Sequence, residues 1–155
     1  MIKMKVVAFL QNMWVKPRSV LSVSKHDPIS DQRERMIAYA LFAGCLTGKR
    51  LIAGLGEYWC ETIKWQEASP MIADNPKDYW PPDPIHIQNV LDKHKPTAVI
   101  SFTRRGADVI LGQVEGNIIL FFECCHPTAR GSQFAKEIIT VRSELDNLLK
   151  CTPTT

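Results

Sequence analysis

Three short groups of polar residues follow apolar runs, and their side chains suit the binding of a nucleobase beside phosphates. The groups are Gln11 and Asn12, then Thr103, Arg104 and Arg105, and last His126, Thr128 and Arg130. Neutral amides and an imidazole can hydrogen-bond a base or orient a water molecule, and arginines can hold phosphates. A helix that begins near Ser132 would add its N-terminus, which binds anions. The residue types therefore predict a site for a base, a sugar and phosphates.

The run before each polar group is typical of a buried β-strand. Residues 5–10 and 96–102 are rich in β-branched and apolar side chains, and the run that begins at Asn117 is rich in Ile and Phe. We expect the last of these strands to be buried on both faces. In an open parallel sheet, ligands bind at the carboxyl ends of the strands, which is where the polar groups fall. Pro127 stops the last strand and holds His126 at a rigid corner.

Helical patterns lie between and after the strands. The predicted helices cover residues 31–43, a stretch from Pro84 that includes His94, 107–111 and 132–150. Ser30 caps the first of these helices and Asp83 caps the second. The last helix carries one apolar stripe, made of Phe134, Ile138, Val141, Leu145 and Leu148. Strands that alternate with amphipathic helices imply a three-layer α/β/α domain with a mostly parallel central sheet, and we expect residues 1–155 to form this single domain.

Two segments between the first and second predicted helices allow different assignments. Residues 49–54 favour a second strand that Gly54 ends early, and residues 58–65 fit either a further strand or a helical turn. Residues 19–30 and 74–82 contain many turn-forming residues and are predicted to be loops. The first of these loops could lie over a site or only connect two elements.

The composition indicates an intracellular globular protein. The chain has 155 residues with a formal charge of +3, 45% hydrophobic residues and 23% charged residues, which is ordinary for a folded domain and permits contact with a polyanion. No apolar run has the length of a membrane span, and the N-terminus lacks the pattern of a signal peptide. The five cysteines show no CxxC spacing, which favours free thiols in a reducing compartment. We therefore expect a cytoplasmic protein that does not contact a membrane.

Cys124, Cys125 and His126 are residue types that bind zinc. Adjacent cysteines on a strand point to opposite faces, however, so both cannot easily reach one ion. The glycine-rich phosphate loops of mononucleotide and dinucleotide-binding proteins are also absent from the sequence. We therefore expect neither a metal nor another cofactor.

Four features occur along the chain in a characteristic order. They are a strand ending in Gln11-Asn12, a capped helix leading through Lys95-Pro96 into a strand over 98–102, then Gly106-Ala107, and a last strand ending in His126-Pro127-Thr128. In these features the sequence resembles the uracil-DNA glycosylase superfamily. The resemblance spans nearly the whole chain, with each motif short. It implies the three-layer fold of that family and DNA as the partner, and we expect the protein to act as a monomer.

The reaction that this resemblance implies is hydrolysis of the N-glycosidic bond of a nucleotide extruded from DNA. By position, Asn12 matches the residue that positions the hydrolytic water, and His126 matches the histidine that hydrogen-bonds O2 of the pyrimidine. A preorganised donor at O2 strengthens as negative charge develops on the departing base. No metal takes part in that reaction.

The resemblance also suggests which residues contact DNA. Arg130 is the candidate for a side chain that wedges into the duplex or clamps it. Phosphate contacts are expected from Thr128 and Ser132, and Arg104 and Arg105 are further candidates on the neighbouring strand end.

Other residues are expected around the base itself. Gln11 and Trp14 would lie in the pocket, with Trp14 at the C5 edge of the pyrimidine. The base-reading residue of the family has three candidate matches, Lys64, Gln66 and Glu67, and spacing does not choose among them.

The sequence departs from the family pattern around its first motif. Leu10 and Met13 stand where a glycine and a proline are expected, so the pocket differs in size and uracil specificity does not follow. These changes would suit a modified pyrimidine, including the bulky bases of some viral DNA. The N-terminal cysteine pair of the iron-sulfur branch is missing, so we expect no cluster.

Simpler interpretations of the same residues are open. His126 could cap a strand end, Asn12 could form a turn, and residues 104–105 could be a solvated loop pair. Three tryptophans could either pack against neighbouring residues or stack on a flipped base: Trp59, Trp65 and Trp80. The fold could also serve a domain that binds nucleic acid or a protein without catalysis, or an enzyme that acts on free nucleosides.

Overall fold

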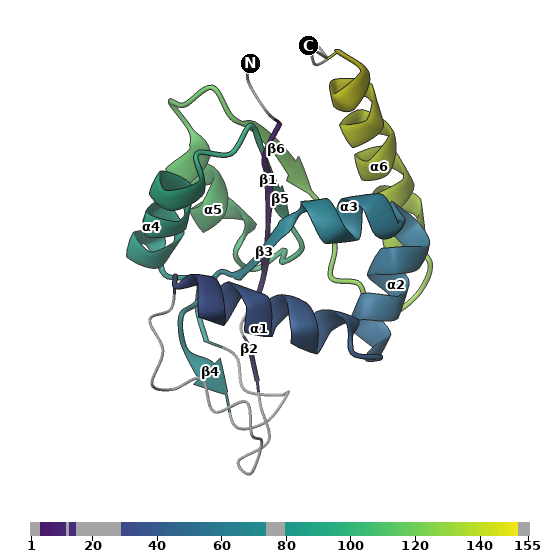
Figure 1. The fold of residues 1–155 in the computed structure, drawn as a ribbon, viewed down its shortest axis with the longest axis horizontal. Coiled ribbons are helices and arrows are strands. Elements are labelled where there is room, and N and C mark those ends of the chain that lie inside the picture. Colours follow the sequence, from purple (N-terminus) through teal and green to yellow (C-terminus); the bar gives the residue numbers. More distant parts are fainter. Residues whose placement is uncertain (1–3, 12, 15–28, 74–79, 152–155) are drawn as a thin grey trace.

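A computed structural model gives the fold of the chain and describes residues 4–11, 13–14, 29–73 and 80–151. Figure 1 shows a central sheet with helices on both sides. The predicted loop over 19–30 and most of the predicted loop over 74–82 lie outside the described residues.

The central sheet has four strands, and every neighbouring pair runs parallel. In spatial order the strands are β3 (Lys64–Glu67), β1 (Val6–Leu10), β5 (Ala98–Ser101) and β6 (Leu120–Glu123). Leu10 is in register with Glu67, and Ser101 is in register with Glu123. All four carboxyl ends therefore lie along one edge of the sheet, which confirms the predicted parallel α/β arrangement.

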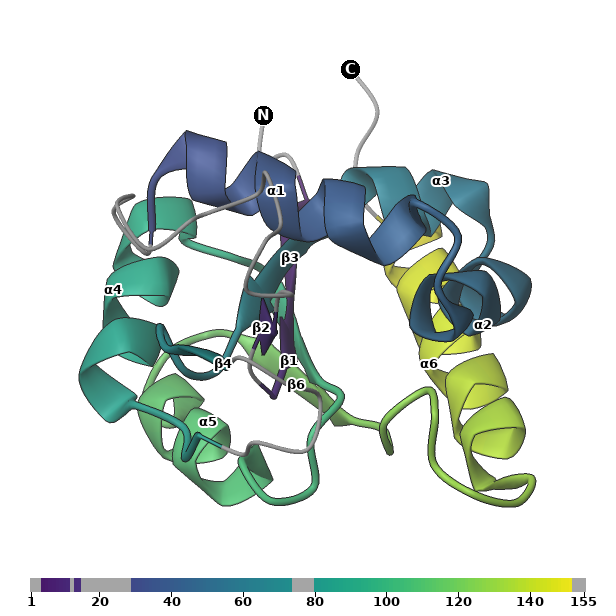
Figure 2. The same ribbon diagram turned by 90° about the horizontal axis from the view of Figure 1, so that it is seen from below.

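Helices cover both faces of this sheet and make it the middle of three layers (Figure 2). One face carries α1 (Asp31–Phe42), α2 (Leu46–Leu55), α3 (Glu57–Thr62) and α6 (Gln133–Cys151). The other face carries α4 (Pro84–His94) and α5 (Ala107–Val114). The predicted three-layer α/β/α class is thus confirmed.

Strand β1 is central because its side chains enter both apolar cores. Val6, Ala8 and Leu10 pack with α1, α2, α3 and α6, whereas Val7 and Phe9 pack with α4 and α5. Alternating side chains of a strand point to opposite faces, so a strand buried on both faces needs apolar residues at every position. All five residues of β1 are buried, which fixes the register of the site-forming segment that follows Leu10.

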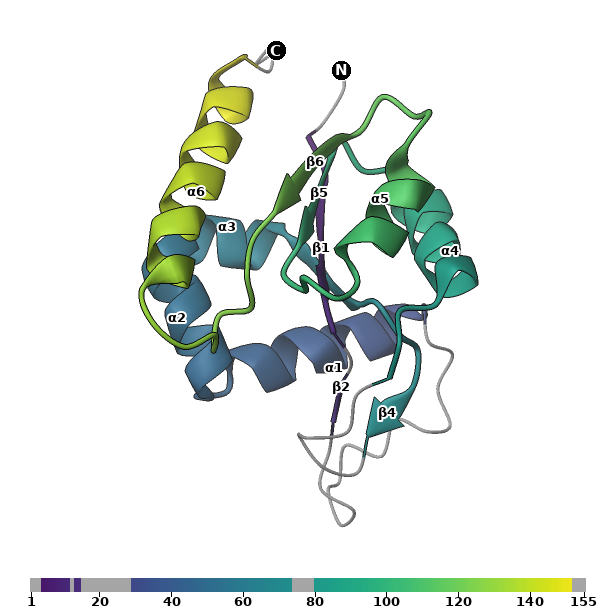
Figure 3. The same ribbon diagram turned by 180° about the vertical axis from the view of Figure 1, so that it is seen from behind.

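A second, two-stranded parallel sheet extends beyond the carboxyl ends of the main sheet (Figure 3). It pairs β2 (Met13–Trp14) with β4 (Ile72–Ala73). The connection is direct, because the backbone N–H of Ala68 donates to the carbonyl of Leu10 at 2.8 Å. The chain segments that leave β1 and β3 therefore continue side by side above the carboxyl edge.

The predicted helix starts are confirmed. The Oγ atom of Ser30 accepts from the backbone N–H of Arg33 at 3.1 Å at the start of α1. The carboxylate of Asp83 accepts from the N–H groups of Ile85 and His86, and Pro84 is the first residue of α4. Caps of this kind satisfy N–H groups that have no partner inside the helix, so they are readable from local sequence.

The predicted strand over 49–54 is wrong, because these residues belong to α2. Leu51 and Leu55 lie four residues apart and are both fully buried, which is the spacing of a helical stripe. Gly54 does not break the helix: a Cβ atom there would meet the Ile138 side chain at 2.7 Å, so the glycine allows α2 and α6 to pack closely. Residues 58–65 divide between α3 and the first half of β3.

The prediction that the last strand is buried on both faces is also wrong. Leu120 is 46% exposed and Glu123 is exposed, while Phe121 and Phe122 are half-buried. Strand β6 is at an edge of the sheet, so one of its sides has no neighbouring strand. The apolar run from Asn117 reflects partial cover by α5 and α6 and not complete burial.

No single described helix is long and apolar enough to cross a membrane. The pair α1 and α2 passes the same test of length and composition only when its two helices, bent by 88° at their junction, are taken together.

Candidate functional site

The four strand ends bring together residues from every part of the chain. Gln11 follows β1, Glu67 ends β3, Thr103 follows β5 and His126 follows β6. Because the strands are about 4.8 Å apart, the outer strands β3 and β6 are separated by roughly 14 Å along this edge. A ligand on the edge would have Glu67 on one side and His126 on the other.

Some predicted site residues cannot be placed on this edge. Asn12 lies outside the described residues, and for Trp14 only the backbone, in β2, is described. Gln11 is half-buried, and its carbonyl accepts from the N–H of Ser69 at 3.3 Å. The backbone of Gln11 is therefore bonded to the segment that follows β3.

His126 is half-buried, and its ring is oriented by the turn that follows it. The backbone N–H of Thr128 donates to Nδ1 of His126 at 3.1 Å, and the Thr128 hydroxyl is 2.7 Å from the same nitrogen. A nitrogen that accepts from an N–H carries no proton, so the neutral ring has its proton on Nε2. Burial lowers the pKa of His126, which favours this neutral form. Among the described residues Nε2 has no hydrogen-bond partner, so it is a donor available to a ligand.

The turn that carries His126 is itself anchored. Pro127 is buried, and its carbonyl accepts from Nη1 of Arg50, on α2, at 2.8 Å. The N–H of Ala129 donates to the carbonyl of His126 at 2.9 Å and closes the turn. Gly131, with φ of +84°, then reverses the chain into α6. The histidine therefore has a fixed backbone position.

The opposite side of the edge holds buried polar groups without partners. Gln66 is fully buried, and within the part of the chain that the structure describes neither its amide oxygen nor its amide nitrogen has a hydrogen bond. Glu67 is 6% exposed. Its Oε2 atom has no hydrogen-bond partner among the described residues, and Nε of the buried Arg33 has none there either. Buried polar groups are nearly always paired in folded proteins. Gln66 is in register with Phe9, on the α4 and α5 side, whereas Glu67 is in register with Leu10, on the side of α1 and Arg33. Glu67 and Arg33 therefore mark the α1 side of this strand end as a candidate for ligand binding.

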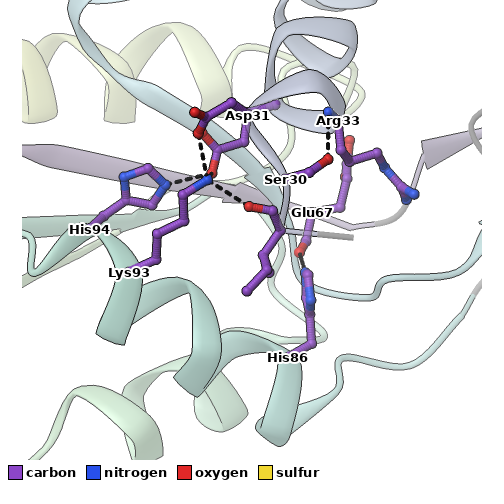
Figure 4. Close-up of polar contacts among 9 residues, drawn as sticks. Ser30, Asp31, Arg33, Glu67, His86, Lys93 and His94 are labelled. Atoms are coloured by element: carbon purple, nitrogen blue, oxygen red, sulfur yellow. Dashed lines mark hydrogen bonds and ion pairs between the residues drawn. The ribbon is translucent and has the colours of Figure 1, made fainter. Parts of the chain in front are cut away.

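Burial controls the charge of Glu67. Desolvation raises the pKa of its carboxyl to about 8, and the positive charge of Arg33 only partly opposes this effect. Between these two described side chains there is no ion pair within 4.0 Å; one Arg33 Nη2 hydrogen bond goes to the carbonyl of Pro70 at 3.0 Å. Figure 4 shows Glu67 between the start of α1 and the start of α4. Near neutral pH Glu67 is thus a carboxylic acid, which can donate a proton.

The backbone of Glu67 is fixed from the α4 side. Nε2 of His86 lies 3.0 Å from the Glu67 carbonyl oxygen (Figure 4). The N–H of Asp83 donates to the carbonyl of Ala68 at 2.9 Å, so the start of α4 is tied to the end of β3. Lys64, by contrast, is exposed and lies three residues before Glu67, about 10 Å toward the other end of the strand. Of the three candidate base readers, Gln66 and Glu67 are therefore the ones near the carboxyl edge.

The predicted phosphate-binding residues differ in their surroundings. Arg104 is held by two carboxylates, Glu123 at 3.2 Å and Glu137 at 2.6 Å, and these contacts raise its pKa. Its charge is therefore already balanced. Arg105 is exposed, as are three residues near the start of α6, namely Thr128, Arg130 and Ser132.

Three potential metal ligands, from Cys124, Cys125 and Glu137, have atoms within 4.8 Å of one another. The expectation that the two cysteines point to opposite faces is wrong, because both follow the end of β6 at Glu123 and do not lie on the strand. Burial raises the pKa of the Cys124 thiol to about 12. The Glu137 carboxylate also accepts from the N–H of Cys125 at 3.2 Å and pairs with Arg104. These groups therefore satisfy one another, and we assign no metal to them.

Arg33 was not among the predicted site residues. The sequence does contain a pattern that could have identified Arg33. It lies four residues before Ile37 and eight before Leu41, so a charged residue falls on the apolar stripe of α1. A charged side chain at such a position needs a partner in the core or at a site.

Comparison with protein-family models and with curated proteins gives no match to this sequence. The functional proposal therefore rests on the residues at the carboxyl edge of the sheet.

Proposed function

We propose that the protein is a DNA glycosylase that hydrolyses the N-glycosidic bond of a uracil or modified pyrimidine nucleotide. The observation that carries this proposal is the state of His126: a neutral imidazole on an anchored turn, with Nε2–H available at the carboxyl edge. A fixed neutral donor of this kind suits an oxygen on which negative charge develops. It also agrees with the sequence resemblance, in which His126 contacts O2 of the pyrimidine.

The reaction breaks the bond between N1 of the base and C1′ of the sugar. The electrons of that bond pass to the base and are shared by O2, while C1′ gains positive character. A preorganised donor at such an oxygen stabilises the transition state by about 2.7–4 kcal/mol, since its dipole needs no reorientation. The Thr128 N–H and the Arg50 side chain fix the turn that carries His126, which supports this role.

The sheet supplies the remaining parts of the proposed site. Asn12 follows the central strand β1 and would direct a water molecule toward C1′, a role that rests on the sequence resemblance. At the β3 side, Glu67 is the buried polar residue that would face the base. Arg105, Arg130 and the start of α6 offer exposed positive charge and N–H groups to phosphates.

The decisive experiment is mass spectrometry of free bases after incubation with a panel of uracil-containing, mismatched and pyrimidine-modified DNAs. Release of a base by the wild type, and its loss in His126→Ala, is the expected result. Glu144→Gln, at an exposed position on α6, is the control and should release the base at the wild-type rate. Tight binding of duplex without release of any base would replace this proposal with a non-catalytic binding domain, and release from free nucleosides alone would replace it with a nucleoside hydrolase.

A further inference from the structure

We propose that Glu67 is the general acid that protonates N3 of the departing base, and that the substrates are therefore 4-amino, cytosine-type pyrimidines. This inference rests on the proposed glycosylase function and names its substrate class. It concerns the side of the carboxyl edge opposite His126, for which the structure shows an unusual set of buried polar groups.

Position is the first reason for this role. Glu67 ends β3 in register with Leu10, the last residue of the central strand β1, so it lies at the carboxyl edge of the sheet. His126 lies across the edge, beyond β5. A pyrimidine between the two would have O2 toward His126 and its N3 and C4 edge toward Glu67.

The second reason is that the carboxyl group has a free oxygen in a buried setting. Oε2 of Glu67 has no hydrogen-bond partner in the described ranges of the chain, although the residue is only 6% exposed. Among the described residues, no ion pair within 4.0 Å joins the carboxyl to Arg33, the cation whose charge acts to lower its pKa. An acid used only for structure would be expected to have its oxygens bonded.

The protonation state is the third reason. Burial keeps the Glu67 carboxyl neutral near neutral pH, with a pKa of about 8. A general acid works best when its pKa is close to the working pH, because it is then both protonated and able to release the proton. The groups that face it are Arg33 from α1 and His86 from α4, and the latter contacts the backbone carbonyl of Glu67 and not its carboxyl.

The chemistry of the leaving group connects this acid to a substrate class. A 4-amino pyrimidine has a basic N3 atom, whereas a 4-oxo pyrimidine such as uracil has N3–H and leaves more readily as an anion. As the bond from N1 to C1′ breaks, the electron pair moves into the ring and the carboxyl proton moves to N3, so the base departs neutral. Water forms the new bond to C1′ and its proton returns through solvent to the Glu67 carboxylate. The balance is one water and one nucleotide giving an abasic sugar and a free base.

The test uses pairs of oligonucleotides that carry the same 5-substituent on a 4-amino or a 4-oxo base, with base release measured for wild type, Glu67→Gln and the surface control Glu144→Gln. Glutamine keeps the shape and hydrogen-bonding capacity of the acid but cannot transfer a proton. Loss of a general acid typically costs about 100-fold or more, so we expect that loss for 4-amino bases and a much smaller one for 4-oxo bases. The control should match wild type on both.

The outcomes separate this inference from the proposed function. Release of only 4-oxo bases by the wild type, or an equal loss on both base types in Glu67→Gln, would overturn the role of Glu67 and leave the glycosylase in place. Release of no base from any oligonucleotide would overturn the glycosylase and the inference with it. If Glu67→Gln does not fold, the pH profile of the wild type decides: release of a 4-amino base should fall above about pH 8, and a rate that stays flat would contradict the proposal.

Discussion

Arg50, on α2, donates a hydrogen bond of 2.8 Å from Nη1 to the carbonyl oxygen of Pro127, and this bond ties the turn that carries His126 to the helical layer. The two residues are 77 positions apart in the chain. Arg50 is exposed as a residue and its loss leaves no large cavity. Its role is therefore to position the turn and not to build the core.

We predict that Arg50→Ala lowers kcat for base release by about tenfold, which corresponds to roughly 1.4 kcal/mol, with little change in KM. The reason is that a looser turn misplaces the Nε2–H donor only in the transition state. Lys49→Ala, one residue away and also exposed, is the matched control and should behave as wild type. Steady-state measurement of kcat and KM, with the best substrate of the panel, tests this prediction. A change in KM alone would mean that Arg50 binds DNA instead of positioning the turn.

The tautomer of His126 can be tested without any substrate. Because the Thr128 N–H donates to Nδ1, nitrogen-15 NMR of the imidazole should show protonation at Nε2 in the neutral ring. Burial should place its pKa below the ordinary 6.5. A ring protonated at Nδ1, or a pKa above 6.5, would contradict the donor role at O2.

Glu67 should make the stability of the protein depend on pH. Its pKa is raised from 4.5 to about 8 in the folded state by burial, so the folded protein keeps a proton that the unfolded chain releases. The stability that comes from the neutral carboxyl is complete below about pH 4.5 and is lost as the pH rises through about 8. The free energy of unfolding of Glu67→Gln, measured relative to that of the wild type, should therefore increase as the pH rises from about 5 to about 9.

Urea unfolding at the two ends of that range measures this effect. The comparison with Glu67→Gln cancels the titration of other groups that face the carboxyl, namely Arg33 and His86. Glu144→Gln, which is exposed, should unfold in parallel with wild type across the range. Parallel curves for Glu67→Gln as well would show that the carboxyl is already ionised in the folded state, through a closer pairing with Arg33.

The elements that could be predicted from the sequence are those with local signals. Ser30 and Asp83 cap their helices through bonds to residues two or three positions away, so no tertiary information is needed. Helix α2 was not predicted because Gly54 was interpreted as a residue that ends a strand. In the structure Gly54 is inside the helix, where the absence of a side chain lets Ile138 of α6 pack against it. Nothing in the local sequence distinguishes that glycine from one that breaks a helix.

The same distinction applies to the sheet and the site. The burial of β6 depends on its place at the edge of the sheet, which strand order sets and local hydrophobicity does not. His126 could be found from its position after an apolar run, whereas the effect of the Arg33 charge on the pKa of Glu67 joins residues 34 positions apart in the sequence. The acid chemistry proposed for Glu67 follows from burial, which only the fold reveals.

Gln66 supplies the last prediction, because neither the oxygen nor the nitrogen of its fully buried amide has a partner among the residues that the structure describes. A buried polar group without a hydrogen bond costs about 1–3 kcal/mol. Gln66→Met has a similar volume and removes this cost, so we expect the free energy of unfolding to rise by roughly 1–2 kcal/mol. Gln32→Met, on the exposed side of α1, is the control and should change stability by less than about 0.5 kcal/mol. Chemical denaturation of both variants gives the answer, and a destabilised Gln66→Met would mean that the amide has a partner in solution and is not an orphan at the edge of the site.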